Sequence, residues 1–307
     1  MQPLRGIMFK VISVCMFMCM ASLIKAASAD VSPGQAVFFR SFFALPIIIG
    51  WLALRGELAT GWRTTNPIGH FWRGLVGTCA MGLGFAGLGL LPLPEVTAIG
   101  YAAPLLVVVF AAMFLDEKVG IFRLSAVLLG MIGVLIVLSP RLSVNAGLST
   151  GETLGAVVVL MGAVMAALAQ VFVRKLVQTE GTAAIVFWFS VTSAVLALCT
   201  LPWGWQVPSM PAVIMLIAAG LLGGMGQIFL TSSYRYADAS LVAPFDYTSM
   251  ILALFIGFFV FDEVPSGTML AGASIVICAG VLIIWRERML GLQRAQQRKA
   301  MGHLGGK

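Results

Sequence analysis

Two ionisable residues lie inside apolar stretches of the sequence, where a charge is costly to maintain. Asp246 stands in the apolar run 238–261, and Arg40 lies five residues after Gln35 in the run 35–54. A charge within hydrocarbon costs a few kcal/mol unless it is paired, protonated or in contact with water. These residue types therefore indicate a site for a polar or charged solute, with Asp246 as its strongest candidate.

Each of these residues also has a structural interpretation. Asp246 could accept a hydrogen bond from a Ser or Thr of a neighbouring helix and so hold two helices together. The long aliphatic stem of Arg40 could carry its charge to the lipid headgroups. Lys25, at the end of the run 7–26, suits an interfacial anchor. The sequence leaves both interpretations of Asp246 and Arg40 open.

Neutral polar and aromatic residues in the apolar runs extend the predicted site. Glutamine can donate and accept hydrogen bonds, and aromatic rings can stack on a flat solute. Buried glutamines also join helix to helix, which is an equally good explanation for them. The predicted substrate-binding residues are Asp246, Tyr247, Thr248, Arg40, Tyr101, Gln170, Gln227 and Trp188.

The remaining candidate residues do not favour catalysis. Asp116-Glu117 and Asp262-Glu263 are paired carboxylates, but each pair ends an apolar run and suits the ordering of a tight turn. His70 is expected in a loop and His303 in the tail, and the five cysteines have no metal-ligand spacing. The sequence contains no Walker motif for nucleotide binding. We therefore expect neither an enzyme, nor a metal, nor a cofactor.

The elements that carry these residues are long apolar runs. The chain has 307 residues, of which 60% are hydrophobic and 10% charged, whereas soluble domains carry roughly 25% charged residues. A helix needs about 20 apolar residues to cross the hydrocarbon layer. The sequence therefore predicts an all-α membrane protein with about ten transmembrane helices, near 7–26, 35–54, 71–91, 95–115, 121–139, 152–173, 182–201, 210–233, 238–261 and 267–285.

The basic residues predict the orientation of these helices. With ten spans and a cytoplasmic amino terminus, 16 of the 19 lysines and arginines, Lys10 and Arg73 among them, fall on the cytoplasmic side. Because translocating positive residues is costly, this bias predicts a multi-pass inner membrane protein of the bacterial type with both termini in the cytoplasm. The scattered charge of +7 does not form the basic face that nucleic-acid binding requires.

An internal repeat supports this plan. The segment from Tyr101 to Asp116-Glu117 aligns with that from Tyr247 to Asp262-Glu263 at a constant offset of 146 residues. Further on, the Gly-Val-Leu-Ile segment 133–136 matches 280–283 after a gap of one residue. Two units of five spans each would have opposite orientations, which is typical of secondary transporters. The two Asp-Glu pairs would then lie on opposite membrane faces and could not share one active site.

Four features of the chain stand together: the doubled five-span plan, Arg40 within the Phe-Phe-Arg-Ser-Phe-Phe segment, the run Tyr101-Ala102-Ala103-Pro104 and the repeated Asp-Glu helix ends. In these features the chain resembles the EamA family of the drug/metabolite transporter superfamily. The resemblance assigns 8–139 and 152–285 to two inverted five-helix repeats and leaves 286–307 as a basic cytoplasmic tail. It implies a carrier of a small organic solute in the lipid bilayer, for which a homodimer is a compatible assembly.

The predicted function is uptake of a metabolite, and riboflavin is the predicted substrate. The opening segment 4–10, Leu-Arg-Gly-Ile-Met-Phe-Lys, resembles a branch of that family that includes riboflavin and S-adenosylmethionine carriers. A strongly anionic solute would need more buried basic groups than Arg40 with Lys25 nearby. Import or export of amino acids or of S-adenosylmethionine is the alternative. An enzyme would need an acid-base or metal cluster and a channel a polar filter, and the sequence displays neither.

Overall fold

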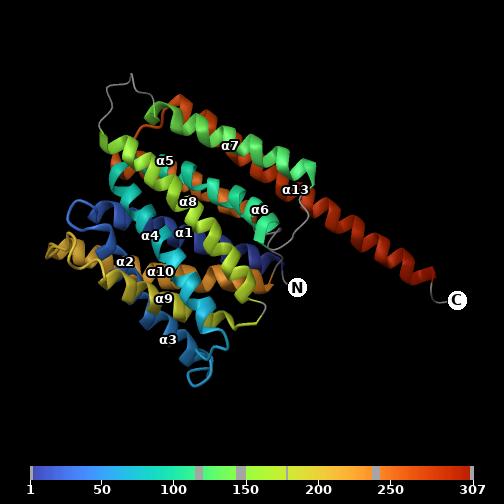
Figure 1. Cartoon of the computed structure of the whole chain (residues 1–307), viewed down its shortest axis with the longest axis horizontal. Coiled ribbons are helices and arrows are strands. Elements are labelled where there is room, and N and C mark those ends of the chain that lie inside the picture. Colours follow the sequence, from blue (N-terminus) through green and yellow to red (C-terminus); the bar gives the residue numbers. More distant parts are fainter. Residues whose placement is uncertain (1–2, 115–119, 143–149, 178, 237–242, 305–307) are drawn as a thin grey trace.

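The structure, a computed structural model, describes residues 3–114, 120–142, 150–177, 179–236 and 243–304. Every regular element within these residues is a helix (Figure 1). In chain order they are α1 (Pro3–Ala27), α2 (Pro33–Phe42), α3 (Ala44–Leu54), α4 (Pro67–Leu90), α5 (Leu93–Gly100), α6 (Ala102–Phe114), α7 (Ile121–Leu142), α8 (Thr150–Leu176), α9 (Thr182–Leu198), α10 (Met210–Tyr236), the 3-10 helix η1 (Ala243–Tyr247), α12 (Thr248–Phe261) and α13 (Gly267–Leu304).

Eight helical segments of the described chain are long and apolar enough to cross a membrane. They are Leu4–Ala27, Pro33–Leu54, Pro67–Leu90, Leu93–Phe114, Leu124–Arg141, Gly151–Val173, Met210–Ser233 and Gly267–Arg286. Two further apolar helices, Thr182–Leu198 and Phe245–Phe261, are shorter and overlap the seventh and ninth predicted spans. A helical membrane architecture is therefore confirmed, whereas the count of ten crossings stays a prediction.

Proline explains two breaks in these segments. A proline ring clashes with the carbonyl group four residues earlier and provides no N–H donor, so a helix breaks shortly before it. α2 and α3 are separated at Phe43, three residues before Pro46, and α5 and α6 at Tyr101, three residues before Pro104. Discontinuous helices are typical of transporter binding sites. Tyr101 lies at one such break, and Arg40 lies three residues before the other.

Helices from the two halves of the chain pack against one another. α1 lies along α10, α4 along α8 and α7 along α13, so each pair joins one helix from either half. Figure 1 shows α7 and α13 side by side at one edge of the bundle. There a Cβ on Gly133 would lie 2.8 Å from the Gly272 carbonyl oxygen, so the absence of a side chain allows the backbones to approach closely. Both halves of the chain therefore contribute residues to each of the apolar clusters of the core.

The last helix extends beyond the last predicted span. Its apolar part, Gly267–Arg286, is long enough to cross a membrane, but α13 continues without a break to Leu304. In Figure 1 this extension projects away from the bundle towards the C terminus. The boundary predicted at residue 285 is therefore not the end of a helix.

Candidate functional site

The two repeat-related tyrosines meet where the halves of the chain join. The ring centroids of Tyr101 and Tyr247 are 5.1 Å apart, with an interplanar angle of 68°. The Tyr101 hydroxyl lies 2.6 Å from the Ser249 hydroxyl and 3.4 Å from the Asp246 carbonyl oxygen. Tyr101 thus reaches from the break between α5 and α6 to the junction of η1 and α12. The repeat offset seen in the sequence corresponds to a direct contact.

Asp246 forms an ion pair with Lys10 of α1. The Lys10 Nζ lies 2.7 Å from the Asp246 Oδ1, and the side chains are 2% and 49% exposed, respectively. The sequence assigned Lys10 to the cytoplasmic side, which stays a prediction; in the structure α1 begins seven residues earlier at Pro3, and Lys10 is buried within the bundle. A half-exposed carboxylate in an apolar helix is stable only where its open side meets water or a polar solute. The pair therefore marks a polar region between α1 and η1.

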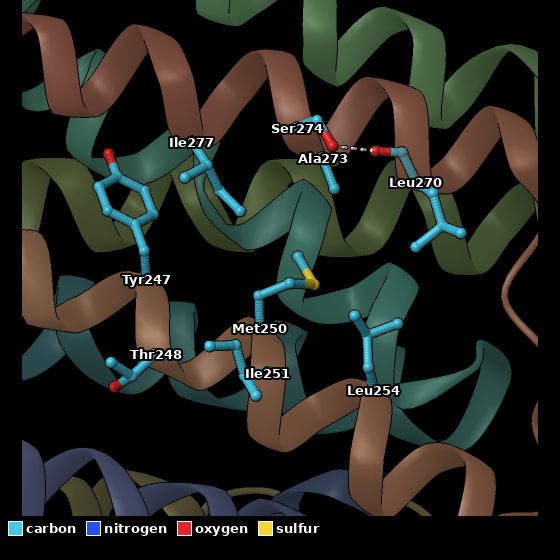
Figure 2. Close-up of a pocket in the computed structure, with 9 residues that line it drawn as sticks. All are labelled: Tyr247, Thr248, Met250, Ile251, Leu254, Leu270, Ala273, Ser274 and Ile277. Atoms are coloured by element: carbon cyan, nitrogen blue, oxygen red, sulfur yellow. Dashed lines mark hydrogen bonds between the residues drawn. The ribbon is translucent and has the colours of Figure 1, made fainter.

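A pocket of about 360 Å³ opens beside this region, between α12 and α13. Figure 2 shows the Tyr247 ring extending towards α13, with Thr248 below it at the start of α12. Gly280 leaves room for this ring, since a Cβ there would fall on the Tyr247 hydroxyl. Most of the lining is apolar, and Ser274 donates its hydroxyl hydrogen to the Leu270 carbonyl at 2.7 Å. The pocket falls within the size range of small-molecule sites.

Arg40 of α2 and Arg73 of α4 lie buried around one aromatic ring. Their Cζ atoms are 5.6 Å and 3.6 Å from the ring centroid of Phe189 of α9. The two arginines are 4% and 9% exposed, so Arg40 does not extend to the headgroups. Neither guanidinium makes a hydrogen bond or ion pair with a residue that the structure describes, and both Nε atoms are buried without a partner. The predicted cytoplasmic side of Arg73 stays a prediction, and the structure buries the residue six positions inside α4.

Other predicted site residues lie apart from the tyrosine pair. Trp188 of α9 donates its indole N–H to the Trp62 carbonyl oxygen at 2.8 Å, in the segment between α3 and α4. Gln170 is exposed on α8, and Gln227 is partly buried on α10. Substrate binding by these residues stays a prediction. The predicted residues that the structure brings together are Tyr101, Asp246, Tyr247 and Thr248.

Lys25 ties the two halves of the chain together at one end of the bundle. Its ammonium group lies 2.9 Å from Glu263 and donates hydrogen bonds to the carbonyls of Leu88 and Leu91 at 3.2 Å and 2.7 Å. Glu263 also accepts a hydrogen bond from the Leu93 N–H at 2.8 Å. Lys25 is therefore more than an interfacial anchor, and Glu263 does more than order its own turn. The other acidic pair, Asp116-Glu117, lies outside the described residues.

Arg141 forms a second network, which the sequence did not predict. Its guanidinium donates to both carboxylate oxygens of Glu95, at 2.9 Å and 3.0 Å, and to Glu152 at 2.5 Å. Two parallel hydrogen bonds to one carboxylate fix its orientation as well as its distance. Because Glu95 belongs to α5 and Glu152 to α8, the network joins both helices to α7. No local sequence pattern connects residues so far apart.

Glu180 accepts hydrogen bonds at the N-terminal end of α4. One of its carboxylate oxygens accepts hydrogen bonds from the Thr65 N–H at 2.8 Å, the Thr65 hydroxyl at 2.7 Å and the Asn66 N–H at 3.0 Å. His70, predicted in a loop, instead lies buried in α4 with its Nε2 3.5 Å from Glu180. Burial alone would raise the pKa of Glu180, but the hydrogen bonds from Thr65 and its neighbours outweigh it and lower the pKa to about 2. Glu180 is therefore ionised at neutral pH.

Similar proteins are known for nearly the whole chain. The EamA-like transporter family matches residues 4–139 and 153–286. An S-adenosylmethionine uptake transporter of Rickettsia prowazekii is 25% identical over 254 residues, which cover 83% of each chain. The pseudopaline exporter of Pseudomonas aeruginosa is 28% identical and covers 91% of this chain and 95% of its own. For the riboflavin transporter of Rhizobium johnstonii the identity is 28% and the coverage 82% and 81%.

A solved crystal structure supports the fold. It is 20% identical in sequence, with a TM-score of 0.66, and the match covers 92% of this chain and 97% of the other. At this identity the likeness concerns the arrangement of helices and not the solute that either protein binds.

Proposed function

The chain belongs to the EamA-like transporter family, and we propose that it is a secondary carrier that moves a small organic metabolite across the inner membrane by alternating access. Its relatives are transporters, so it is a multi-pass membrane protein and not an enzyme. The observation that carries the proposal is the meeting of Tyr101 with Tyr247 beside the Lys10–Asp246 pair. Carriers built from repeats bind their solute at such a junction.

The two repeats, 8–139 and 152–285, are proposed to have opposite orientations, with both termini in the cytoplasm. The basic residues support this orientation, and so does the pairing of α1 with α10, α4 with α8 and α7 with α13. A phosphatase that acts only in the periplasm, fused after Lys307, should be inactive, whereas a fusion in the loop after Pro202 should be active. The reverse pattern would overturn the orientation.

Two solutes compete as the substrate, riboflavin and S-adenosylmethionine. Both contain a flat heteroaromatic ring, which suits the tyrosine pair and the adjoining pocket. The sequence argument against a strongly anionic solute assumed few buried basic groups, yet Lys10 and Arg73 are buried as well. This observation favours a solute that also carries a carboxylate, such as S-adenosylmethionine or an amino acid. Riboflavin uptake remains the second candidate.

Transport by the purified protein in liposomes tests the proposal. Labelled S-adenosylmethionine, riboflavin and an amino-acid mixture are presented separately, with protein-free liposomes as the control. We expect saturable uptake of one of them and faster exchange when the liposomes are preloaded with the same unlabelled solute. Flux that does not saturate would indicate a channel instead, and conversion of the label into a new compound would indicate an enzyme.

A further inference from the structure

Arg40 and Arg73 place two positive charges inside the bundle that nothing in the described part of the chain neutralises. The described carboxylates with a basic partner are engaged elsewhere: Glu57 with Arg55, Glu95 and Glu152 with Arg141, Glu180 with His70, Asp246 with Lys10, and Glu263 with Lys25. Both arginines retain buried N–H groups without an acceptor. The shared Phe189 ring is their only attractive contact of a polar kind among the described residues.

This arrangement is costly unless something else binds there. Burying a charge without a partner costs much more than a cation–π contact with one ring returns. A purely structural role would therefore be served better by an apolar side chain of similar length. The charges are better explained by an anion that is bound during part of the protein's working cycle.

The surroundings are shaped to hold both guanidiniums. A Cβ on Gly77 would lie 2.5 Å from the Arg73 Nη1 and 2.8 Å from the Phe189 ring, so a side chain there would force the stacked groups to shift. On α10, a Cβ on Gly223 would lie 3.1 Å from the Arg40 Nε. Two glycines on different helices therefore accommodate the two arginines, which indicates a built site and not an accident of packing.

We propose that Arg40 and Arg73 form an anion-binding site for the carboxylate of the transported metabolite. A guanidinium presents a planar fork of N–H donors that matches the two oxygens of a carboxylate. Two such groups around one ring provide more donors than a single oxygen pair needs. The inference rests on the proposed carrier function and narrows its substrate to a carboxylate-bearing solute, since riboflavin has no carboxylate.

The site is enclosed in the described conformation, so the solute reaches it when α2, α4 and α9 separate. Alternating access provides such an opening, because the bundle rearranges around its binding site. A free inorganic anion such as chloride or phosphate could satisfy the same donors. The experiments below distinguish that source from the carboxylate of a solute.

The first experiment measures the thermal unfolding of the purified protein without solute. Arg73→Met keeps a long apolar stem and removes the charge, and Arg55→Met is the matched control, since Arg55 stacks on Trp51 at 5.0 Å but is paired with Glu57 at the surface. We expect the unfolding midpoint of Arg73→Met to rise by about 2–4 °C and that of Arg55→Met to change little. A lower midpoint for Arg73→Met would show that the arginine stabilises the empty protein and would overturn the proposal.

The second experiment adds ligands that differ only in the carboxylate. Acetate is compared with neutral acetamide at constant ionic strength, and S-adenosylmethionine with its decarboxylated form. We expect acetate but not acetamide to stabilise the natural protein, and this effect to be lost in Arg40→Met and Arg73→Met but kept in Arg55→Met. Equal responses to acetate and acetamide would refute the site whether or not S-adenosylmethionine is a substrate, so the outcome is separable from that of the transport assay.

Uptake completes the test. For a solute that the protein transports, Arg73→Met should lower uptake on the order of 10- to 100-fold, as expected when a charge-assisted hydrogen-bonding partner is lost. Removing the carboxylate from the solute should lower uptake by the natural protein similarly and have little further effect on the variant. If phosphate or chloride stabilises the protein as well as acetate, and the solute's carboxylate makes no difference, the site holds an inorganic anion instead.

Discussion

The Lys10–Asp246 pair and the Arg40–Arg73 pair place charges inside the same bundle in opposite ways. In the first, an ammonium and a carboxylate lie 2.7 Å apart, so the charges compensate each other. In the second, two like charges share one aromatic ring and have no anionic partner among the described residues. Gly223 lies against both Arg40 and Met20 of α1, and Lys10 precedes Met20 by ten residues. Arg40 therefore lies about 15 Å from Lys10 along α1.

The difference separates two uses of a buried charge. A compensated pair holds its elements together in every solute state, and removing either partner leaves the other buried. An uncompensated pair makes the empty protein less stable, and an anion that binds to it raises the stability of the protein. We therefore expect substitutions in the two regions to change the stability of the empty protein with opposite signs.

The largest effect is expected at Asp246. Asp246→Asn keeps the size of the side chain but removes the charge that compensates Lys10, so uptake should fall at least about tenfold. The free energy of unfolding should fall by about 1–3 kcal/mol, less than for a fully buried pair because half of the Asp246 side chain is exposed. Thermal unfolding and liposome uptake measure the two effects. Normal uptake by Asp246→Asn across pH would make the residue a structural contact only.

The double variant Lys10→Met/Asp246→Asn sharpens this prediction. With both charges removed, most of the lost stability should return, while transport should stay impaired because the polar region is gone. A double variant as unstable as the single one would mean that the ion pair does not carry the effect.

A charge compensated by neutral donors should give a loss of stability of similar size. Glu180→Gln replaces a carboxylate that accepts several hydrogen bonds, and we expect it to lower stability by about 1–3 kcal/mol at pH 7. The pKa of Glu180 falls from 4.5 to about 2 on folding, so its ionised form contributes stability above pH 4.5 and loses it as the pH falls towards 2. Unfolding midpoints of the two proteins should converge across that range. A constant difference down to pH 2 would assign the effect to something other than this carboxylate.

The same regions show which structural features can be predicted from the sequence. The apolar runs predicted the helical architecture, and the repeat offset identified Tyr101 and Tyr247 as equivalent residues, which the structure brings into contact. The burial of Lys10 and Arg73 was not predicted, because each stands close to a helix end, where a basic residue is equally consistent with a surface position. Which side chains face each other depends on helix rotation, and a nearly uniform apolar sequence hardly specifies it. The Arg141–Glu95–Glu152 network was missed for the same reason.

The smallest effects are expected at the tyrosines, which are uncharged and lie beside the compensated pair. The Tyr101 hydroxyl contacts Ser249 at 2.6 Å, whose own hydroxyl donates to the Asp246 carbonyl, so Tyr101→Phe should lower the free energy of unfolding by about 1 kcal/mol. Tyr247→Phe is the matched variant. It should change stability by less than about 0.5 kcal/mol, because the Tyr247 hydroxyl makes no hydrogen bond with a described residue.

The uptake of Phe and Leu variants tests whether the tyrosine rings bind the solute by stacking. If they do, both Phe variants should keep uptake within about threefold of the natural protein. Tyr101→Leu and Tyr247→Leu should lower uptake about tenfold, equivalent to the 0.5–1.5 kcal/mol of an aromatic pair. Uptake at several solute concentrations, measured beside unfolding midpoints, separates the two roles of the ring and the hydroxyl. Equal uptake by the Leu and Phe variants would mean that the tyrosine pair joins the two halves of the chain without touching the solute.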